Sequence, residues 1–220
     1  MTITRIERQK RDSHRVNIYI DGEFSFGTHD NVLVKFGLRK GDTLTKEQLD
    51  TISSEEEEAR AKQQSLRFIS YRMRSEKEIR RKLTEKEFPP DVITRTVDRL
   101  RTLGLVNDLE FARLFVHDQQ LRRPSGKRLL TQKLRMKGIT TAIIHCVLSE
   151  TTGPEEEHSA ALEAARKQMK RRKTPRDKAA RLKEQQRVAR FLAQRGYEWS
   201  TISPVLRTLF KSESIAREEY

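Results

Sequence analysis

The stretch RMRSEKEIRRKL, residues 72–83, combines a helix start with an amphipathic helix. Ser75 is followed three residues later by Glu78, which is the pattern of a capping box. Ile79 and Leu83 then stand four residues apart, on one face of the helix that follows. The stretch therefore predicts a short helix, from about residue 76, with one buried side.

The same apolar spacing occurs three times along the chain. Leu134 lies 51 residues after Leu83, and Leu192 lies 58 residues after Leu134. Once these leucines are aligned, the neighbouring apolar positions match: Ile79 with Leu130 and Val188, Phe88 with Ile139 and Tyr197, Ile93 with Ile144 and Ile202, and Val97 with Leu148 and Leu206. Such self-similarity is typical of a repeat architecture. We therefore expect three units of one design, with these positions in the core.

Each unit is expected to contain three helices. They span about 56–73, 76–87 and 90–103 in the first unit, 108–122, 126–137 and 140–150 in the second, and 155–172, a segment ending near 195 and a segment starting at Pro204 in the third. Pro90 suits a first helical turn, and Gly104, Gly138 and Gly196 suit helix ends that need a positive φ. Because such short units bury little surface alone, they should stack into an elongated, curved array. The predicted fold is mainly α, built of tandem three-helix repeats.

A different pattern precedes the repeats. In VNIYIDGEFSFG, residues 16–27, apolar residues alternate on both sides of Asp21-Gly22, a strong hairpin signal. Ile3 and Ile6 suggest a third strand, and the segment around Val32 suggests a covering helix. The serines and glutamates of residues 53–58 resemble a solvated helix start. We therefore expect a cap at 1–52 that contains the hairpin, and repeats at 53–106, 107–152 and 153–220, the last with a basic insertion.

The charge of the chain indicates a polyanionic partner. The formal net charge is +14 and the isoelectric point is about 10.1. Residues 1–58 carry a net charge of −3 and residues 59–220 carry +17. A strongly basic field attracts nucleic acid or an acidic protein surface. The repeats are therefore expected to hold the binding surface.

Few residues suit chemistry or a membrane. The single cysteine, Cys146, stands in an apolar stretch, which fits a reducing compartment, and neither a long apolar run nor a signal peptide is evident. No two of the five histidines have metal-binding helical spacing, and no phosphate loop or nucleophile elbow occurs. We expect a cytoplasmic monomer with no enzyme activity, metal, cofactor or membrane contact. A nuclease built from distant carboxylates stays open as a third class of function.

Basic clusters are the candidate binding residues. Residues 166–190 hold twelve Lys and Arg against two acidic residues. Such density suits phosphate neutralisation, although a solvated helix face is the alternative. Aromatic residues are only 6% of the chain, so base stacking is not indicated, and Tyr197 and Trp199 are expected in the core. The candidate contacts to a protein partner or to DNA phosphate are Arg80, Arg81, Lys82, Arg122, Arg123, Lys127, Arg128, Lys133, Arg135, Lys170, Arg171, Arg172 and Lys173.

Three motifs, in order, resemble those of the RecX family. Residues 72–83 are similar to its R-x-R-S-x-x-E-[LI]-x-x-K-L segment, and GLVNDLEFA, residues 104–112, resembles its G-[LY]-[LI]-[ND]-D-x-x-[FY]-A. Residues 126–139 hold Gly126-Lys127-Arg128-Leu129 and Leu134-x-x-Lys137-Gly138-Ile139, similar to G-x-x-[RK]-[IL] and L-x-x-K-G-I. The resemblance covers residues 59–150 best, and the cap resembles the N-terminal extension of longer members.

The resemblance implies a crescent of repeats that binds in the groove of the RecA–DNA filament. It further implies inhibition of the ATPase and strand exchange of RecA, and a role in homologous recombination, DNA repair and the SOS response. Nonspecific contacts with single- and double-stranded DNA are expected beside those with RecA. The alternative is an architectural protein that binds nucleic acid nonspecifically and acts without RecA. Inhibition of RecA by less than one molecule per subunit would separate the two.

Overall fold

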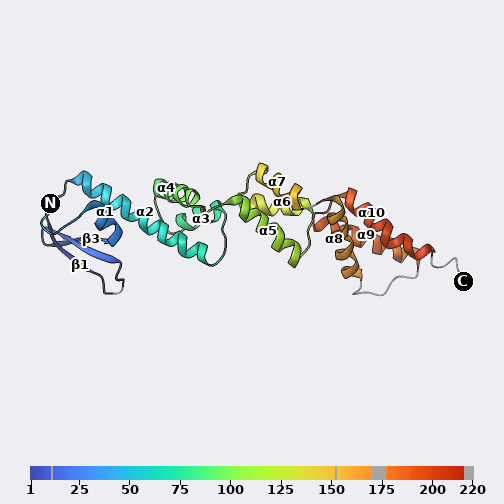
Figure 1. Ribbon diagram of the computed structural model, residues 1–220. Helices are drawn as coiled ribbons and strands as arrows, with labels where there is room; N and C mark the ends of the chain where they lie inside the picture. The colour runs from blue at the N-terminus through green and yellow to red at the C-terminus, as the bar shows by residue number, and fades with distance from the viewer. Residues whose placement is uncertain (11, 152, 170–176, 216–220) are drawn as a thin grey trace. The chain divides into compact units, whose positions relative to one another are not determined.

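The computed structural model describes residues 1–10, 12–151, 153–169 and 177–215. Three strands come first, β1 (Ile3–Arg8), β2 (Arg15–Ile20) and β3 (Glu23–His29). Ten helices follow in these ranges: α1 (Asp30–Phe36), α2 (Lys46–Ser70), α3 (Glu76–Thr84), α4 (Pro90–Thr102), α5 (Asp108–Arg122), α6 (Lys127–Met136), α7 (Thr141–Thr151), α8 (Pro154–Met169), α9 (Lys178–Gln194) and α10 (Trp199–Ile215) (Figure 1). The chain divides into two compact units, Met1–Val106 and Asn107–Tyr220. The mainly helical fold is thus confirmed.

The three strands form an antiparallel sheet in the order β1-β2-β3. Asp21 and Gly22, between β2 and β3, have φ values of 49° and 95°. Positive φ at both residues is what a two-residue type I′ turn requires. The hairpin and the third strand, β1, are both confirmed.

Phe24 departs from the expected alternation. The pairing of β2 with β3 shifts by one residue, so Phe26 lies opposite Ile18 while Phe24 lies opposite Tyr19. A one-residue shift sends a side chain to the other face of the sheet. Phe24 is therefore exposed, and its ring contacts that of Tyr19 edge-on.

The core of the cap lies under one face of the sheet. It consists of the buried residues Ile3, Ile18, Ile20, Val32, Leu38, Leu44 and Ile52. Val32 comes from α1, the expected covering helix, and Ile52 comes from α2. Helix α2 begins earlier than expected, because Thr45 and Gln48 form a capping box there. The helix start expected at residue 53 is wrong, and α2 runs from the cap into the first repeat without a break.

Glu56 corrects the interpretation of residues 53–58 as a solvated acidic segment. Its side chain is 8% exposed and pairs with Arg15 of β2 at 2.7 Å. The other carboxylate oxygen accepts hydrogen bonds from the Thr28 hydroxyl at 2.8 Å and from the His29 backbone N–H at 2.6 Å. Buried carboxylates need such partners. Glu56 therefore fastens the sheet to α2.

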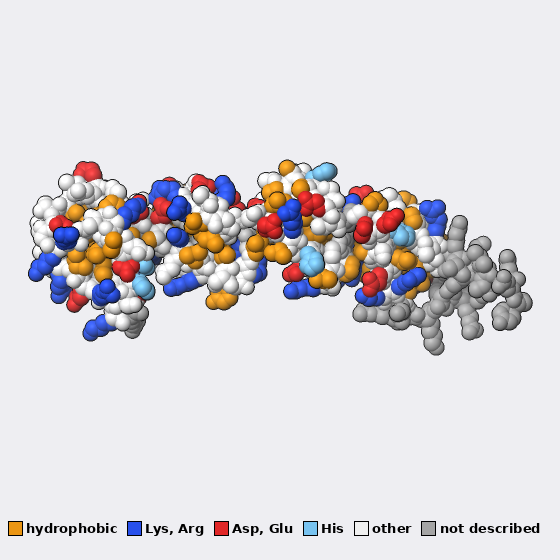
Figure 2. All heavy atoms as spheres, in the orientation of Figure 1, with side chains coloured by type: hydrophobic (Ala, Val, Ile, Leu, Met, Phe, Trp, Pro, Cys, Tyr) orange, Lys and Arg blue, Asp and Glu red, His pale blue; other side chains and the backbone are white. Residues whose placement is uncertain are grey.

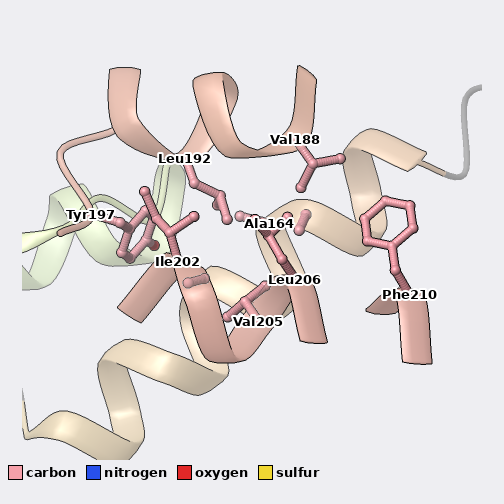
Figure 3. Packing of buried hydrophobic residues seen from close by; sticks show 10 residues of the cluster. Ala164, Val188, Leu192, Tyr197, Ile202, Val205, Leu206 and Phe210 are labelled. Carbon is pink, nitrogen blue, oxygen red and sulfur yellow. The ribbon is translucent and has the colours of Figure 1, made fainter. Parts of the chain in front are cut away.

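The aligned apolar positions of the three repeats all pack in the core. The exposed fraction is 1% or less for Leu83, Leu134 and Leu192. The other buried members of the alignment are Ile79, Leu130, Val188, Ile139, Tyr197, Ile93, Ile144, Ile202, Val97, Leu148 and Leu206, and Phe88 packs against the same core while partly buried. The repeat predicted from the sequence is confirmed. Figure 3 shows the third copy, in which Leu192, Tyr197 and Ile202 point toward one another.

The second helix of each repeat ends in the same turn. Glu87, Gly138 and Gly196 occupy equivalent positions, with φ of 61°, 87° and 83°. The next residue in each copy donates its backbone N–H to the carbonyl of the aligned leucine, for example Tyr197 to Leu192 at 3.2 Å. Such a residue in the left-handed region ends many helices and is usually glycine. Gly138 and Gly196 fit the expectation, whereas Glu87 was not foreseen.

In the second unit, backbone packs directly on backbone between the second and third repeats. The Gly126 N–H donates to the Arg195 carbonyl at 2.9 Å, and the Arg128 N–H donates to the Gly196 carbonyl at 3.2 Å. A Cβ on Gly126 would lie 2.3 Å from the Gly196 carbonyl oxygen. Buried Glu157 of α8 accepts from the Lys127 N–H at 3.1 Å. The first turn of α6 is therefore capped by the following repeat.

Two expectations about single residues are wrong. Helix α10 begins at Trp199, with Pro204 inside it, and not at Pro204. Trp199 is 67% exposed, because it precedes the buried stripe of α10 that begins at Ile202, whereas Tyr197 is buried as expected. Cys146 is also exposed, because the buried stripe of α7 comprises Ile144, Val147 and Leu148.

Candidate functional site

The first predicted cluster, on α3, is partly paired with neighbouring carboxylates. Arg80 pairs with Glu76 at 2.8 Å, and its side chain is only 35% exposed. Arg81 and Lys82 each approach Glu85 at 3.4 Å. In Figure 2, basic and acidic side chains lie interspersed over the part of the molecule that α4 occupies in Figure 1. These three residues therefore offer less free charge than the sequence suggested.

The second predicted cluster comprises Arg122, Arg123, Lys127, Arg128, Lys133 and Arg135. All of these residues except Lys133 line one of two hollows in the second unit. Arg122 and Arg123, at the end of α5, line a cavity of about 410 Å³. The remaining lining residues come from three elements: Gln120, Leu121 and Pro124 next to them, Glu163, Ala164, Lys167 and Gln168 of α8, and Phe191 and Arg195 around the end of α9. We call this cavity the α8 hollow. It joins cations from two different repeats.

Arg195 is the best positioned cation of the α8 hollow. Its guanidinium donates to the Pro124 carbonyl at 3.1 Å and lies 4.7 Å from the centroid of the Phe191 ring. Partial burial lowers the pKa of Arg195, and the nearby charge of Arg123 lowers it further. Both causes reflect the cost of a positive charge at this place. An anion bound there would relieve that cost.

The other charges of the α8 hollow are more exposed. Arg122 lies 3.8 Å from Asp118, with side chains 83% and 64% exposed, and such a surface pair is weak. Lys167 pairs with Glu163 at 2.7 Å, also at the surface. Arg123 makes no ion pair with any described residue. The hollow therefore keeps a positive excess centred on Arg123 and Arg195.

The second hollow contains the remaining described cations of the cluster except Lys133. Its volume is about 750 Å³, and it is lined by Lys127, Arg128, Thr131, Gln132, Arg135, Met136 and Glu198. Lys133 lies elsewhere, with its Nζ donating to the Gln119 side chain at 2.8 Å. Arg128 and Arg135 make no ion pair within the described ranges. Lys170, Arg171, Arg172 and Lys173 lie outside the described residues.

Sequence reasoning missed Arg195 and Lys167 as members of the site. A signal for Arg195 was present in the repeat: Lys86, Lys137 and Arg195 occupy the equivalent position, directly before the left-handed residue. A cation at a helix C-terminus interacts favourably with the helix dipole. The recurrence of a basic residue there could have marked this turn as a shared feature of the repeats.

Groups suited to catalysis are sparse in the described part of the chain. No cluster of three or more His, Cys, Asp or Glu residues there could hold a metal ion. The thiol of Cys146 lies 3.2 Å from a carboxylate oxygen of Glu150, and this contact raises the pKa of Cys146 and so disfavours the thiolate. No helix in the described ranges is long and apolar enough to cross a membrane.

Four family models match successive parts of the chain. They are the RecX regulatory protein N-terminal domain at residues 1–45 and the first, second and third three-helix domains of RecX at 61–100, 107–148 and 155–206. The order of these matches is the order of the cap and the three repeats. Together they cover most of the chain.

Whole-length comparisons agree with the family models. The chain is 35% identical to the regulatory protein RecX of Clostridium acetobutylicum, over 97% of this chain and 98% of that protein, and 33% identical to that of Clostridioides difficile, over 94% and 95%. A crystal structure of regulatory protein RecX superposes with a TM-score of 0.75 at 30% identity, covering 93% of this chain and 98% of that one. The chain therefore belongs to the RecX family of regulatory proteins and is a regulator, not an enzyme.

Proposed function

We propose that this chain regulates homologous recombination by binding the RecA–DNA filament and inhibiting its ATPase and strand exchange. Membership of the RecX family across the whole chain supports the proposal. The proposed contact surface is the α8 hollow. Arg123 and Arg195 stand close together there without acidic partners among the described residues. Such a concentrated positive field suits phosphate or an acidic protein surface.

The first experiment titrates the full chain into RecA filaments preassembled on single-stranded DNA. The ATPase rate is expected to fall at well below one molecule per RecA subunit, because a regulator that caps or disrupts a filament affects many subunits. An unchanged ATPase rate together with persistent DNA binding would instead support an architectural protein that acts without RecA.

The contact surface is tested with the double variant Arg122→Gln/Arg123→Gln. Both side chains are exposed, so the fold should survive the change. The matched control is Arg39→Gln/Lys40→Gln, which removes the same charge from exposed positions outside both hollows. We expect the concentration needed for half inhibition to rise several-fold in the first variant only. Equal inhibition by the two variants would contradict the assignment of the α8 hollow.

A further inference from the structure

A third basic hollow lies in the first unit, and none of its cations was among the candidate contacts from the sequence. Its volume is about 270 Å³, and it is lined by Arg15, Arg60, Gln63, Gln64, Arg67, Lys86 and Phe88. These residues come from β2, from α2 and from the turn between α3 and α4. Three segments that are distant in the sequence thus place four cations around one small cavity. We call it the α2 hollow.

The charges of the α2 hollow are poorly compensated by the protein. Arg15 is neutralised by its pair with buried Glu56. Arg60, Arg67 and Lys86 are exposed and make no ion pair with any described residue. Arg60 is held over the Phe88 ring, 5.8 Å from the ring centroid. Three cations sharing one cavity repel one another, and a bound anion would remove that repulsion.

The lining residues favour phosphate over an acidic protein segment. Arginine guanidinium groups bind phosphate oxygens through two parallel hydrogen bonds, and the amides of Gln63 and Gln64 add neutral donors. Phe88 is the only apolar side chain among the described lining residues, and it already packs against the core. The described lining of this cavity offers no free apolar side chain of the kind that anchors many protein–protein interfaces.

The α2 hollow occupies the same place in its repeat as the α8 hollow. Ala61 of α2 and Ala161 of α8 are both fully buried in the first helix of their repeats. Counted from these alanines, Arg67 and Lys167 are equivalent, and each faces the hollow together with the basic residue before the left-handed turn, Lys86 or Arg195.

The second repeat has only one of these two basic positions. Ala112 is the buried alanine of α5, and the position equivalent to Arg67 is then Asp118, an acidic residue. Its carboxylate lies 3.8 Å from Arg122. The first and third repeats therefore share a cation at this position, whereas the second repeat has a carboxylate there.

We propose that the α2 hollow binds a phosphate group of a nucleic-acid backbone, with Arg60, Arg67 and Lys86 as its ligands. The cap then has a role, because its strand β2 supplies Arg15 to the lining of the hollow. The ion pair between Arg15 and Glu56 holds this strand against α2. The proposal concerns nucleic acid alone, so it stands whether or not the chain acts on RecA.

The test uses the full chain and a fluorescein-labelled dT20 oligonucleotide, with anisotropy recorded from 50 to 300 mM KCl. The variant Arg60→Gln/Arg67→Gln is compared with Arg39→Gln/Lys40→Gln, which removes the same charge from exposed residues of the same unit outside the hollow. Each phosphate contact on a single strand contributes about 0.7 to the slope of log K against log [salt]. We expect the slope to fall by about 0.7, the share of one phosphate, in the hollow variant and to stay unchanged in the control.

Poly-L-glutamate serves as the probe for an acidic protein segment. If the hollow variant binds the oligonucleotide like the control, or loses only its binding of poly-L-glutamate, the proposal is overturned. Circular dichroism and thermal melts of both variants establish that they fold. Lys86→Gln is a further single variant outside α2, and it should lower the salt slope by less than the double variant does, because Arg60 and Arg67 keep their contact with the same phosphate.

Discussion

At the residue scale, Glu87 stands where the other two repeats have glycine. Its φ of 61° is costly for a side chain with a Cβ, by roughly 1–2 kcal/mol, whereas glycine loses about 0.5–1 kcal/mol through the entropy of the unfolded chain. Glu87→Gly is therefore expected to raise the free energy of unfolding by about 0.5–1 kcal/mol. Urea unfolding followed by circular dichroism measures the change. Glu85→Gly, at a φ of −61°, should instead lower the free energy of unfolding. A loss of stability in both variants would contradict the explanation.

Tyr197 gives the chain a pH dependence at the alkaline end. Its hydroxyl is buried with no hydrogen-bond partner in the described part of the chain, and burial raises the pKa of Tyr197 to about 12. The folded state thus keeps a proton that the unfolded chain releases near pH 10. The free energy of unfolding should therefore fall as the pH rises from about 10 towards 12.

Tyr197→Phe isolates this contribution. At pH 7 the variant should be within about 1 kcal/mol of the parent, or more stable, because it buries no unpaired hydroxyl. Between pH 9 and 11 the parent should lose more stability than the variant in urea unfolding. An equal loss in both proteins would show that other groups cause the alkaline decline.

At the scale of elements, one buried ion pair joins the sheet to α2. Removing the carboxylate in Glu56→Ala leaves Arg15 without its partner and two hydrogen-bond donors unsatisfied. We expect a loss of about 3–5 kcal/mol, seen as a lower urea midpoint and faster hydrogen exchange in β2 and β3. The matched control is Glu55→Ala, whose pair with Lys35 is more exposed. It should cost less than about 1 kcal/mol, and similar losses in the two variants would refute the role of Glu56.

Helix α6 depends on a glycine for a steric reason. Gly126 has a φ of −74°, which any residue adopts, but a Cβ there would collide with the Gly196 backbone. Gly126→Ala should therefore destabilise the second unit by about 1–3 kcal/mol. Gly153 also directly precedes a helix, yet its Cβ would meet only the movable Glu156 carboxylate. Thermal unfolding should show a clearly smaller effect for Gly153→Ala, and equal effects would mean that helix capping alone is responsible.

At the scale of the whole molecule, the proposed binding of nucleic acid implies contacts with phosphates and not with base edges. The net charge is +14, and the exposed Trp199 and Phe24 line none of the three basic hollows. The aromatic residues that do line them, Phe88 and Phe191, pack against the core and against Arg60 and Arg195. Two duplexes of equal length and different sequence should therefore bind within about threefold of each other, because phosphate contacts carry no sequence information. Anisotropy titrations at one fixed salt concentration measure the ratio, and a strong preference for one duplex would indicate base reading. The crescent shape implied by the resemblance stays a prediction.

The sequence by itself determined the repeats, the hairpin and the family. Each of these follows from the spacing of residues that are close in the sequence: apolar residues at helical intervals, Asp21-Gly22 between two segments of alternating apolar residues, and motifs at fixed offsets. Helix starts were less predictable, because Thr45 competes with Ser53 as a cap and only the packing of Ile52 under the sheet decides between them.

Only the tertiary structure decided which charges are free. Arg80 and Arg123 look alike in the sequence, yet Arg80 is paired with Glu76 whereas Arg123 faces Arg195, which comes from another repeat. Glu56 and Glu55 are neighbours, yet only Glu56 is buried, by contact with a strand about forty residues away. The field and the solvent exposure at a side chain depend on groups brought together by folding. For that reason the α2 hollow and the place of Arg195 in the α8 hollow emerge from the fold, whereas Arg122 and Arg123 already belong to the charge clusters of the sequence.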